Sequence, residues 1–506
     1  MAREIKINTF SNVIANYGGK AWTFLSIYIF IPLFIKFLGI EAYAVIGFYT
    51  LILGIVSFVD IGLSATITRE FARNINFSEK YSILLIVERL YAFICLGVGI
   101  VIFFLSPLIA EKWLTANSIP TLELIYYLKW IGAGVAVQVF SSVFFGGLMG
   151  LHKQVTANVI QTSWGILRYG GAILLFVVVK PTLEVFFIWQ FICNVLYVLV
   201  LRTSLIRNLK KGGTQLVKVL HSLPKETWKY VGGMALIALI SAINIQADKI
   251  VTSSVFNLDQ FGYYTLASTL SKLVLVVGTP IGIAIFPVFA KLVSEMKYED
   301  LISSFERFGF LLNIVVLSVG IGVCLYAPQI VIIWTGKHTF SPAIIHEISL
   351  ITRLLSIGGI CLALQLMPFY LLLAKGETKY TIWQGMAQIT FMIPAFYFFV
   401  KRWGMVGAGI PWAIINFGGM VYLYGILAKK EFGINYRQFF KYALIVPLLI
   451  CIGTFFLFYL MIPLHNNYLM LMEGLVAGAL SFILNIIFYN RCKGNKISDM
   501  KLLLKN

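Results

Sequence analysis

The sequence contains little charge for its length. Only 12% of its 506 residues are Asp, Glu, Lys or Arg, and the 21 acidic residues are outnumbered by 40 basic ones. Hydrophobic residues make up 59% of the chain, the mean hydropathy is +0.89, and no interval between apolar stretches is long enough for a soluble domain. This composition excludes a water-soluble globular protein and predicts a polytopic membrane protein.

Residues that bind metals or form disulfides are also scarce. The six cysteines fall within apolar stretches or at a cytoplasmic end, so no disulfide is expected. The five histidines are scattered, and neither HxxxH nor CxxC spacing occurs. Because the nucleotide-binding pattern GxxxxGK[ST] is absent too, we expect no metal, cofactor or nucleotide site.

Apolar runs of about 20 residues, each long enough to cross a bilayer as a helix, recur along the whole chain. The N-terminal segment lacks a cleavage site of small residues after a short apolar core, so we expect it to remain as the first helix. The predicted fold is all-α with about fourteen membrane spans, at 13–35, 42–60, 82–105, 124–148, 156–179, 184–201, 231–256, 262–289, 305–326, 344–373, 381–399, 406–427, 439–461 and 468–489.

Lys and Arg are distributed unevenly over the loops. With a cytoplasmic N-terminus, 26 of the 40 lie in inside segments and 6 in outside loops. This asymmetry predicts that both termini are cytoplasmic. The basic face would then lie against anionic membrane lipids, which explains the charge better than binding to nucleic acid does.

The two halves of the chain resemble each other. LGIEAYAVIGFYT at 38–50 matches FNLDQFGYYTLAS at 256–268 with an offset of 218 residues, and after a drift of a few residues Lys129 matches Arg353. Repeated units of six spans would run parallel and could rock against each other, which is typical of alternating access. The predicted divisions are an N-lobe at 1–205, a basic cytoplasmic linker at 206–230, a C-lobe at 231–428, and two added spans with a cytoplasmic tail at 429–506.

Cations inside predicted spans are the most informative polar residues. A cation at bilayer depth costs about 2.5 to 3.5 kcal/mol, so it needs a wet cavity, a partner or an anionic ligand. Arg168, Lys272 and Arg353 lie near mid-depth with no acid within a helical turn. We predict a cationic cleft that binds an anionic substrate, and pairing with a distant helix is the structural alternative. The candidate cleft residues are Arg168, Lys272, Arg353, Lys129, Lys249 and Lys20.

The junction FVDIGLSATITREFARN at 58–74 places charge directly after an apolar span. It is predicted to be the cytoplasmic end of the second span, serving either as an anchor, with Arg69 and Arg73 facing headgroups, or as a gate. Candidates for gating or coupling are Asp60, Asp248, Arg69, Glu70, Arg89 and Arg307.

The segment FLGIEAYAVIGFYTLILGIVSFVDIGLSATITREFARN at 37–74, LHKQ at 151–154 and LRYGGAI at 167–173 resemble Wzx-type O-antigen flippases. These form part of the polysaccharide transporter family, within the multidrug, oligosaccharidyl-lipid and polysaccharide exporter superfamily. The resemblance implies a MATE-like fold in the bacterial inner membrane. It also implies transfer of an undecaprenyl-diphosphate-linked oligosaccharide from the cytoplasmic to the periplasmic leaflet, in association with polymerase and chain-length proteins.

Two other functions remain as alternatives at this point. A multidrug or organic-cation antiporter of the same superfamily would need unpaired intramembrane acids, for which Asp60 and Asp248 are the candidates. A polymerase or ligase would need a large outside loop with catalytic residues, but the loops at 106–123 and 327–343 are short. We therefore expect a transporter and not an enzyme. Polar and aromatic residues that could recognise the glycan are Tyr169, Asn244, Gln246, Gln384 and Gln388.

Overall fold

The structure is a computed structural model that describes residues 2–73, 76–210, 245–430, 435–461 and 466–493. Side chains are described for all of these except 2–17, 20, 58–63, 65, 461, 492 and 493. These ranges are helical apart from short turns and one isolated bridge. Eleven of the described helical segments are long and apolar enough to cross a bilayer, which confirms the predicted all-α polytopic fold.

The number of fourteen spans stays a prediction. The predicted spans at 156–179 and 381–399 correspond to α5 (Gln154–Val178) and α14 (Thr378–Gly407), which are long but too polar to be among the eleven. The predicted span at 231–256 begins within 211–244, outside the described residues.

The chain divides by its internal contacts into two compact units, here called unit 1 (Met1–Gly262) and unit 2 (Tyr263–Asn506). The predicted linker lies largely outside the described residues, and helical residues 245–255 pack within unit 1. There Trp113 donates from Nε1 to Oγ of Ser253 at 3.0 Å, and the amide of Leu258 donates to the carbonyl of Thr115 at 2.8 Å.

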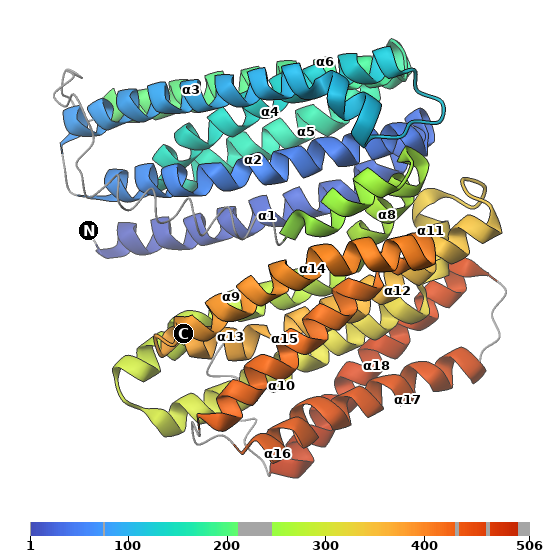
Figure 1. Cartoon of the computed structure of the whole chain (residues 1–506). Coiled ribbons are helices and arrows are strands. Elements are labelled where there is room, and N and C mark those ends of the chain that lie inside the picture. The colour runs from blue at the N-terminus through green and yellow to red at the C-terminus, as the bar shows by residue number, and fades with distance from the viewer. Residues whose placement is uncertain (1, 74–75, 211–244, 431–434, 462–465, 494–506) are drawn as a thin grey trace. The chain divides into compact units, whose positions relative to one another are not determined.

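Unit 1 is a helix bundle in which α4 packs against α2, α3 and α6, while α1 packs against α5 (Figure 1). Long apolar runs favour such helices in a membrane, and α1 and α3 continue through Pro32 and Pro107. Besides α5, its helices are α1 (Ala2–Leu38), α2 (Ile40–Ala72), α3 (Phe77–Leu108), the π-helix η1 (Ile109–Trp113), α4 (Thr121–Gly150) and α6 (Leu183–Lys210).

Small residues on α4 allow α2 to approach it closely. A Cβ added at Gly150 would lie 2.5 Å from the carbonyl oxygen of Thr68, and one at Gly146 would lie 3.0 Å from that of Ser64. The hydroxyl of Thr68 donates to the carbonyl of Gly146 at 3.1 Å. This four-residue spacing of glycines is the pattern that lets membrane helices meet at their backbones.

Unit 2 is built around α10, which packs against α9, α12, α17 and α18, and around α12, which packs against α15. Besides α14, its helices are α8 (Leu258–Ser271, beginning in unit 1), α9 (Leu273–Ser294), α10 (Tyr298–Leu325), α11 (Ala327–Thr335), α12 (Pro342–Leu364), α13 (Leu366–Ala374), α15 (Ile410–Lys429), α16 (Tyr436–Phe439), the π-helix η2 (Phe440–Ile445), α17 (Val446–Met461) and α18 (Asn467–Lys493).

Two predicted spans of unit 2 are interrupted helices. The span at 262–289 is divided between α8 and α9 at Lys272, and the span at 344–373 is divided between α12 and α13 at Gln365. Pro368 contributes to the second interruption because it has no amide N–H to donate to the carbonyl of Leu364. The hydroxyl of Tyr424 on α15 donates to that carbonyl instead, at 3.2 Å.

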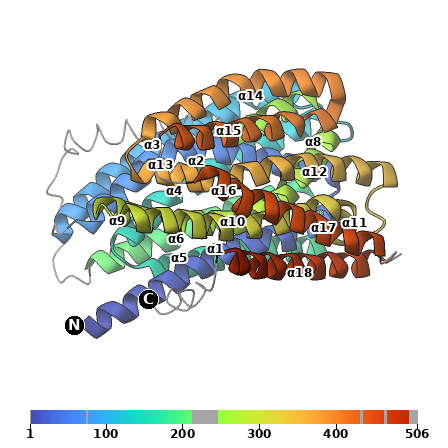
Figure 2. The ribbon, with the colours of Figure 1, turned by 90° about the horizontal axis from the view of Figure 1, so that it is seen from below.

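The two C-terminal helices α17 and α18 run side by side and pack on α10 (Figures 1 and 2). Polar contacts fix this packing, since the hydroxyl of Ser318 on α10 lies 3.0 Å from that of Ser481 on α18. The π-helix η2 has backbone hydrogen bonds between residues five apart instead of four. The carbonyl of its Ala443 accepts a hydrogen bond from the side-chain amide of Asn313 on α10 at 2.7 Å.

The turns that follow α4 and α13 have the same hydrogen bonds, 224 residues apart. In the first, the amides of His152 and Lys153 donate to the carbonyls of Met149 and Leu148; in the second, those of Gly376 and Glu377 donate to the carbonyls of Leu373 and Leu372. His152 and Gly376 both have positive φ, at 57° and 74°. The two turns therefore end their helices in the same left-handed manner, as expected for repeated halves.

Candidate functional site

Arg168 lies within α5 and is only 5% exposed. Its Nε donates to Oε1 of Gln190 on α6, and its Nη2 donates to the hydroxyl of Tyr49 on α2 at 3.1 Å. The ring centroids of Tyr49, Trp164 and Tyr169 lie 5.5, 4.9 and 5.1 Å from its Cζ. Three helices thus hold the guanidinium by hydrogen bonds and cation–π contacts.

The positive charge of Arg168 has no carboxylate partner within the described residues, whose salt bridges all lie elsewhere. These two hydrogen bonds use two of the five N–H donors of its guanidinium. The indole N–H of Trp164 is also buried with no hydrogen-bond partner in the described part of the chain. Donors therefore exceed acceptors here, and the spare donors suit the oxygens of an anionic ligand.

Lys129, on α4, lies in a different setting. Its Nζ lies 4.6 Å from the ring centroid of Phe103 on α3, and the side chain lines a 550 Å³ groove between α3, α4 and α6. The other lining residues are apolar or small, among them Phe104, Phe140 and Phe191. The aromatic contact stabilises the ammonium locally.

Arg353 is half-buried on α12 and contacts the backbone of α10. Its Nε donates to the carbonyl of Cys324 at 2.9 Å, one residue before that helix ends. A cation is favourable there because the last carbonyls of a helix lack intrahelical donors. Its repeat mate Lys129 has an aromatic contact instead, so the two matched cations have different surroundings.

Lys272 is exposed at the interruption between α8 and α9. Lys249 is 8% exposed, beside the equally buried Asp248, in helical residues 245–255. The side chains of Lys20 and Asp60 lie outside the described residues. Burial of Lys249 beside an adjacent acid agrees with a local charge balance, whereas Lys272 is open to ligands or headgroups.

Around the junction at 58–74, Glu70 is 4% exposed and accepts a bond from Arg73 Nη1 at 2.7 Å. Arg69 is exposed. Glu70 and Arg73 thus form an ion pair at the end of α2, and Arg73 also lines a pocket.

The remaining gating candidates lie on α3 and α10. Arg89 is exposed, and Arg307 is half-buried. The neighbouring Glu88 is bound by Arg202 of α6, with Nε to Oε1 at 2.7 Å. The long side chain of the exposed Arg89 can carry its charge to lipid headgroups.

A cluster of side-chain amides in unit 2 is not apparent from hydropathy or charge. Gln384 of α14 donates to Oε1 of Gln365, whose own Nε2 donates to the carbonyl of Asn416 at 2.9 Å. Gln388 reaches the same place, since a Cβ added at Gly419 would lie 2.5 to 3.1 Å from all three glutamine side chains. Gln384 and Gln388 had been predicted as glycan contacts, but Gln365 and Gly419 had not.

A second polar site missed by the sequence analysis lies at the start of α2. The carboxylate of Glu41 accepts bonds from the amides of Asn117 and Ser118 and from the Ser118 hydroxyl. Asn117 also donates to Asp259 at 2.7 Å. Glu41 and Asp259 are 218 residues apart, which is the offset of the repeat. Both acids accept a hydrogen bond from Asn117, so the repeat could have indicated that these matched acids share a partner.

A family model described as "Polysaccharide biosynthesis protein" matches residues 9–293, more than half of the chain. A curated Shigella flexneri protein named "Putative O-antigen transporter" is 22% identical over 385 residues, which is 74% of this chain and 87% of that protein.

Two solved structures share the fold. One is described as "Lipid II flippase MurJ, inward closed conformation" and has a TM-score of 0.73 at 15% identity, covering 95% of this chain and 98% of that chain. The other is an inward-facing multidrug resistance MATE family transporter of the MOP superfamily, with a TM-score of 0.64 at 17% identity, covering 82% and 95%. At these identities the likeness concerns the fold alone.

Proposed function

Because the chain belongs to the polysaccharide biosynthesis protein family, we propose that it is a flippase for lipid-linked oligosaccharides. Specifically, it moves undecaprenyl-diphosphate-linked repeat units of an O-antigen or a related polysaccharide from the cytoplasmic to the periplasmic leaflet. It does so in the bacterial inner membrane, with both termini in the cytoplasm. The O-antigen relative and the fold shared with a lipid II flippase support this proposal.

One observation in the structure carries the proposal, namely the donor-rich surroundings of Arg168. A buried guanidinium without a carboxylate is costly unless a ligand supplies the missing acceptors. The oxygens of a diphosphate do so well, since the planar guanidinium can bind two of them at once. Within unit 2, the amide cluster around Gly419 offers donors and acceptors suited to sugar hydroxyls.

The energetics of the transfer agree with this assignment. Sugar hydroxyls that lose their hydrogen bonds in hydrocarbon cost several kcal/mol each, so a polar path lined by protein lowers the barrier. A diphosphate carries about two negative charges, and its outward movement gains about 5 kcal/mol per 100 mV of inside-negative potential. We propose that membrane potential is sufficient to drive net export.

The multidrug antiporter alternative has less support. Of its two candidate acids, Asp248 is buried beside Lys249, and the side chain of Asp60 lies outside the described residues. An organic cation would need such acids free to bind it.

The test uses a strain that lacks its own flippase and displays polysaccharide only when this chain is supplied with the matching glycan genes. We expect Arg168→Ala to abolish display. Arg168→Lys should restore part of it, because it keeps the charge but loses the planar fork. Lys337→Ala, in an exposed turn of unit 2, is the matched control and should display normally.

Membrane levels and thermal unfolding of each variant are measured in parallel, so that loss of display is not confused with loss of the protein. Normal display by correctly inserted Arg168→Ala would contradict a role for this arginine in substrate binding. Drug resistance without polysaccharide display would favour the antiporter.

A further inference from the structure

A pocket of 440 Å³ lies at the end of unit 1 where the turn after α2 meets the turn between α4 and α5. The last turn of α6 closes it through Asn208. It is distinct from the surroundings of Arg168, which lies about 21 Å along α5 from the start of that helix at the usual rise of 1.5 Å per residue. The described lining residues are Phe71, Ala72, Arg73, Phe77, Lys80, Gly150, Leu151, His152, Lys153 and Asn208.

Basic groups predominate around this pocket. Arg73, Lys80, His152 and Lys153 all line it, and no carboxylate does so among its described residues. Arg73 shares its charge with Glu70 at 2.7 Å. Lys80 donates from Nζ to the carbonyl of Phe71 at 2.7 Å, which uses one of its three N–H donors.

Lys153 has no counter-ion in the described part of unit 1 and is exposed. The pocket therefore has a surplus of positive charge that no carboxylate in its described lining neutralises. Such a surplus beside a cavity favours an anion from outside the chain.

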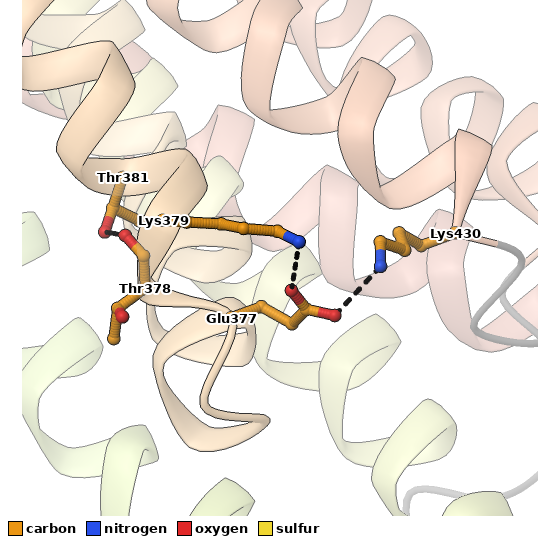
Figure 3. Close-up of polar contacts among 5 residues, drawn as sticks. All are labelled: Glu377, Thr378, Lys379, Thr381 and Lys430. Atoms are coloured by element: carbon orange, nitrogen blue, oxygen red, sulfur yellow. Dashed lines mark hydrogen bonds and ion pairs between the residues drawn. The ribbon is translucent and has the colours of Figure 1, made fainter.

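The matching turn of unit 2 shows how the same backbone is neutralised. There the residue 224 positions after Lys153 is Glu377, with the same amide hydrogen bond. Its carboxylate binds Lys430 at 2.9 Å and Lys379 at 3.9 Å (Figure 3). Unit 2 thus supplies an anion at the position where unit 1 has a cation.

We propose that the unit 1 pocket binds the phosphate group of a lipid headgroup from the adjoining leaflet. Its cations supply charge-assisted donors for phosphate oxygens, which replace the carboxylate that Glu377 provides in unit 2. A lipid is the source because α5 continues from the pocket with exposed apolar side chains, Val155 at 39% and Val159 at 57% exposure. These can lie along the acyl chains while the phosphate occupies the pocket.

The experiment uses the full chain in nanodiscs of phosphatidylcholine with increasing phosphatidylglycerol, and counts retained lipids by native mass spectrometry. We expect Lys153→Glu to weaken phosphatidylglycerol retention by about tenfold, because it introduces an internal anion like that of unit 2. Lys153→Gln should give an intermediate effect and serves if the first variant is unstable. Lys337→Glu, an equal change of charge at an exposed turn of unit 2, should retain lipid like the wild type.

A second arm adds soluble glycerol phosphate. Failure of this soluble anion to displace the lipid at millimolar concentration supports a headgroup site. Full displacement would overturn the lipid source in favour of a free phosphate compound, and equal lipid retention by wild type and both Lys153 variants would overturn the site itself.

Discussion

Gly419 determines how closely three glutamine side chains of unit 2 can gather. A Cβ at this position would lie 2.5 Å from Nε2 of Gln384, 2.8 Å from Oε1 of Gln365 and 3.1 Å from Nε2 of Gln388. Gln365 is 4% exposed and cannot move freely, since it also bonds to the carbonyl of Asn416. The three side chains can therefore gather only because residue 419 is glycine and has no Cβ.

We expect Gly419→Ala to displace the amide cluster, which should lower polysaccharide display severalfold and cost about 1 to 3 kcal/mol of stability through overpacking. Gly418→Ala is a matched control on the same helix, because a Cβ there meets nothing within 4 Å. Display and thermal unfolding of the two variants provide the comparison. Equal behaviour would show that the cluster is not sensitive to its packing.

The charges at the turn between α13 and α14 lie outside the apolar spans and should titrate measurably. The ammonium of Lys430 donates to the Glu377 carboxylate, which lowers the pKa of Glu377 below its usual value and raises the pKa of Lys430 (Figure 3). The nearby Lys379 further lowers the pKa of Glu377.

Glu377→Gln should lower the unfolding temperature slightly at neutral pH, because the ion pair is exposed and salt-screened. The folded carboxyl has the lower pKa, so its contribution is present above the ordinary carboxyl pKa and disappears as the pH falls through the folded value. The difference between wild type and variant should thus shrink from about pH 7 to about pH 3. Glu299→Gln, at an exposed position in the first turn of α10, is the control; a difference independent of pH would refute the pairing.

At the level of helices, the interruption between α12 and α13 has a specific chemical cause. Pro368 cannot donate to the carbonyl of Leu364, and Tyr424 from α15 supplies the missing donor. The interruption and the contact between α12 and α15 are thus parts of one arrangement. Its repeat counterpart α4 runs unbroken from Thr121 to Gly150.

Tyr424→Phe should destabilise the chain by about 1 kcal/mol or more, because a buried carbonyl loses its donor. The same change should cost less in a Pro368→Ala background, where the new amide can bond to Leu364. Denaturant unfolding of both single variants and the double variant gives the coupling energy. Tyr422→Phe, at an exposed position on the same helix, should be neutral, and strict additivity would disprove the link between Pro368 and Tyr424.

Elements were predictable where a local pattern determines them. Runs of about 20 apolar residues located most spans, but the matching turns at His152 and Gly376 were not predicted from the similarity of the two halves. The interruptions at Lys272 and Gln365 were not anticipated, because each occupies one residue within an otherwise apolar run.

For the molecule as a whole, contacts between segments far apart in the chain could not be predicted from the sequence. The spacing of Arg353 from acids suggested a free cation, but its donor meets the carbonyl of Cys324, which carries no signal in the sequence. Likewise Glu88 binds Arg202, 114 residues away. Arg168 could be singled out as a candidate because an arginine within a predicted span, with no acid within a helical turn, is visible in the sequence.

Each of the two units has a polar site of its own. Unit 1 provides the buried guanidinium of Arg168, and unit 2 provides the amide cluster at Gly419. Lipid-linked oligosaccharides combine a diphosphate with sugar hydroxyls, so these two sites match the two polar parts of the proposed substrate.

The most direct measurement of this account is flipping in proteoliposomes that contain the purified chain and a fluorescent oligosaccharide linked to polyprenyl diphosphate. Lectin accessibility from outside reports transfer between leaflets. We predict rapid transfer by the wild type, faster when the potential favours movement of the anion, and loss of most transfer in folded Arg168→Ala. Transfer no faster than in empty liposomes, or wild-type rates in Arg168→Ala, would contradict the account.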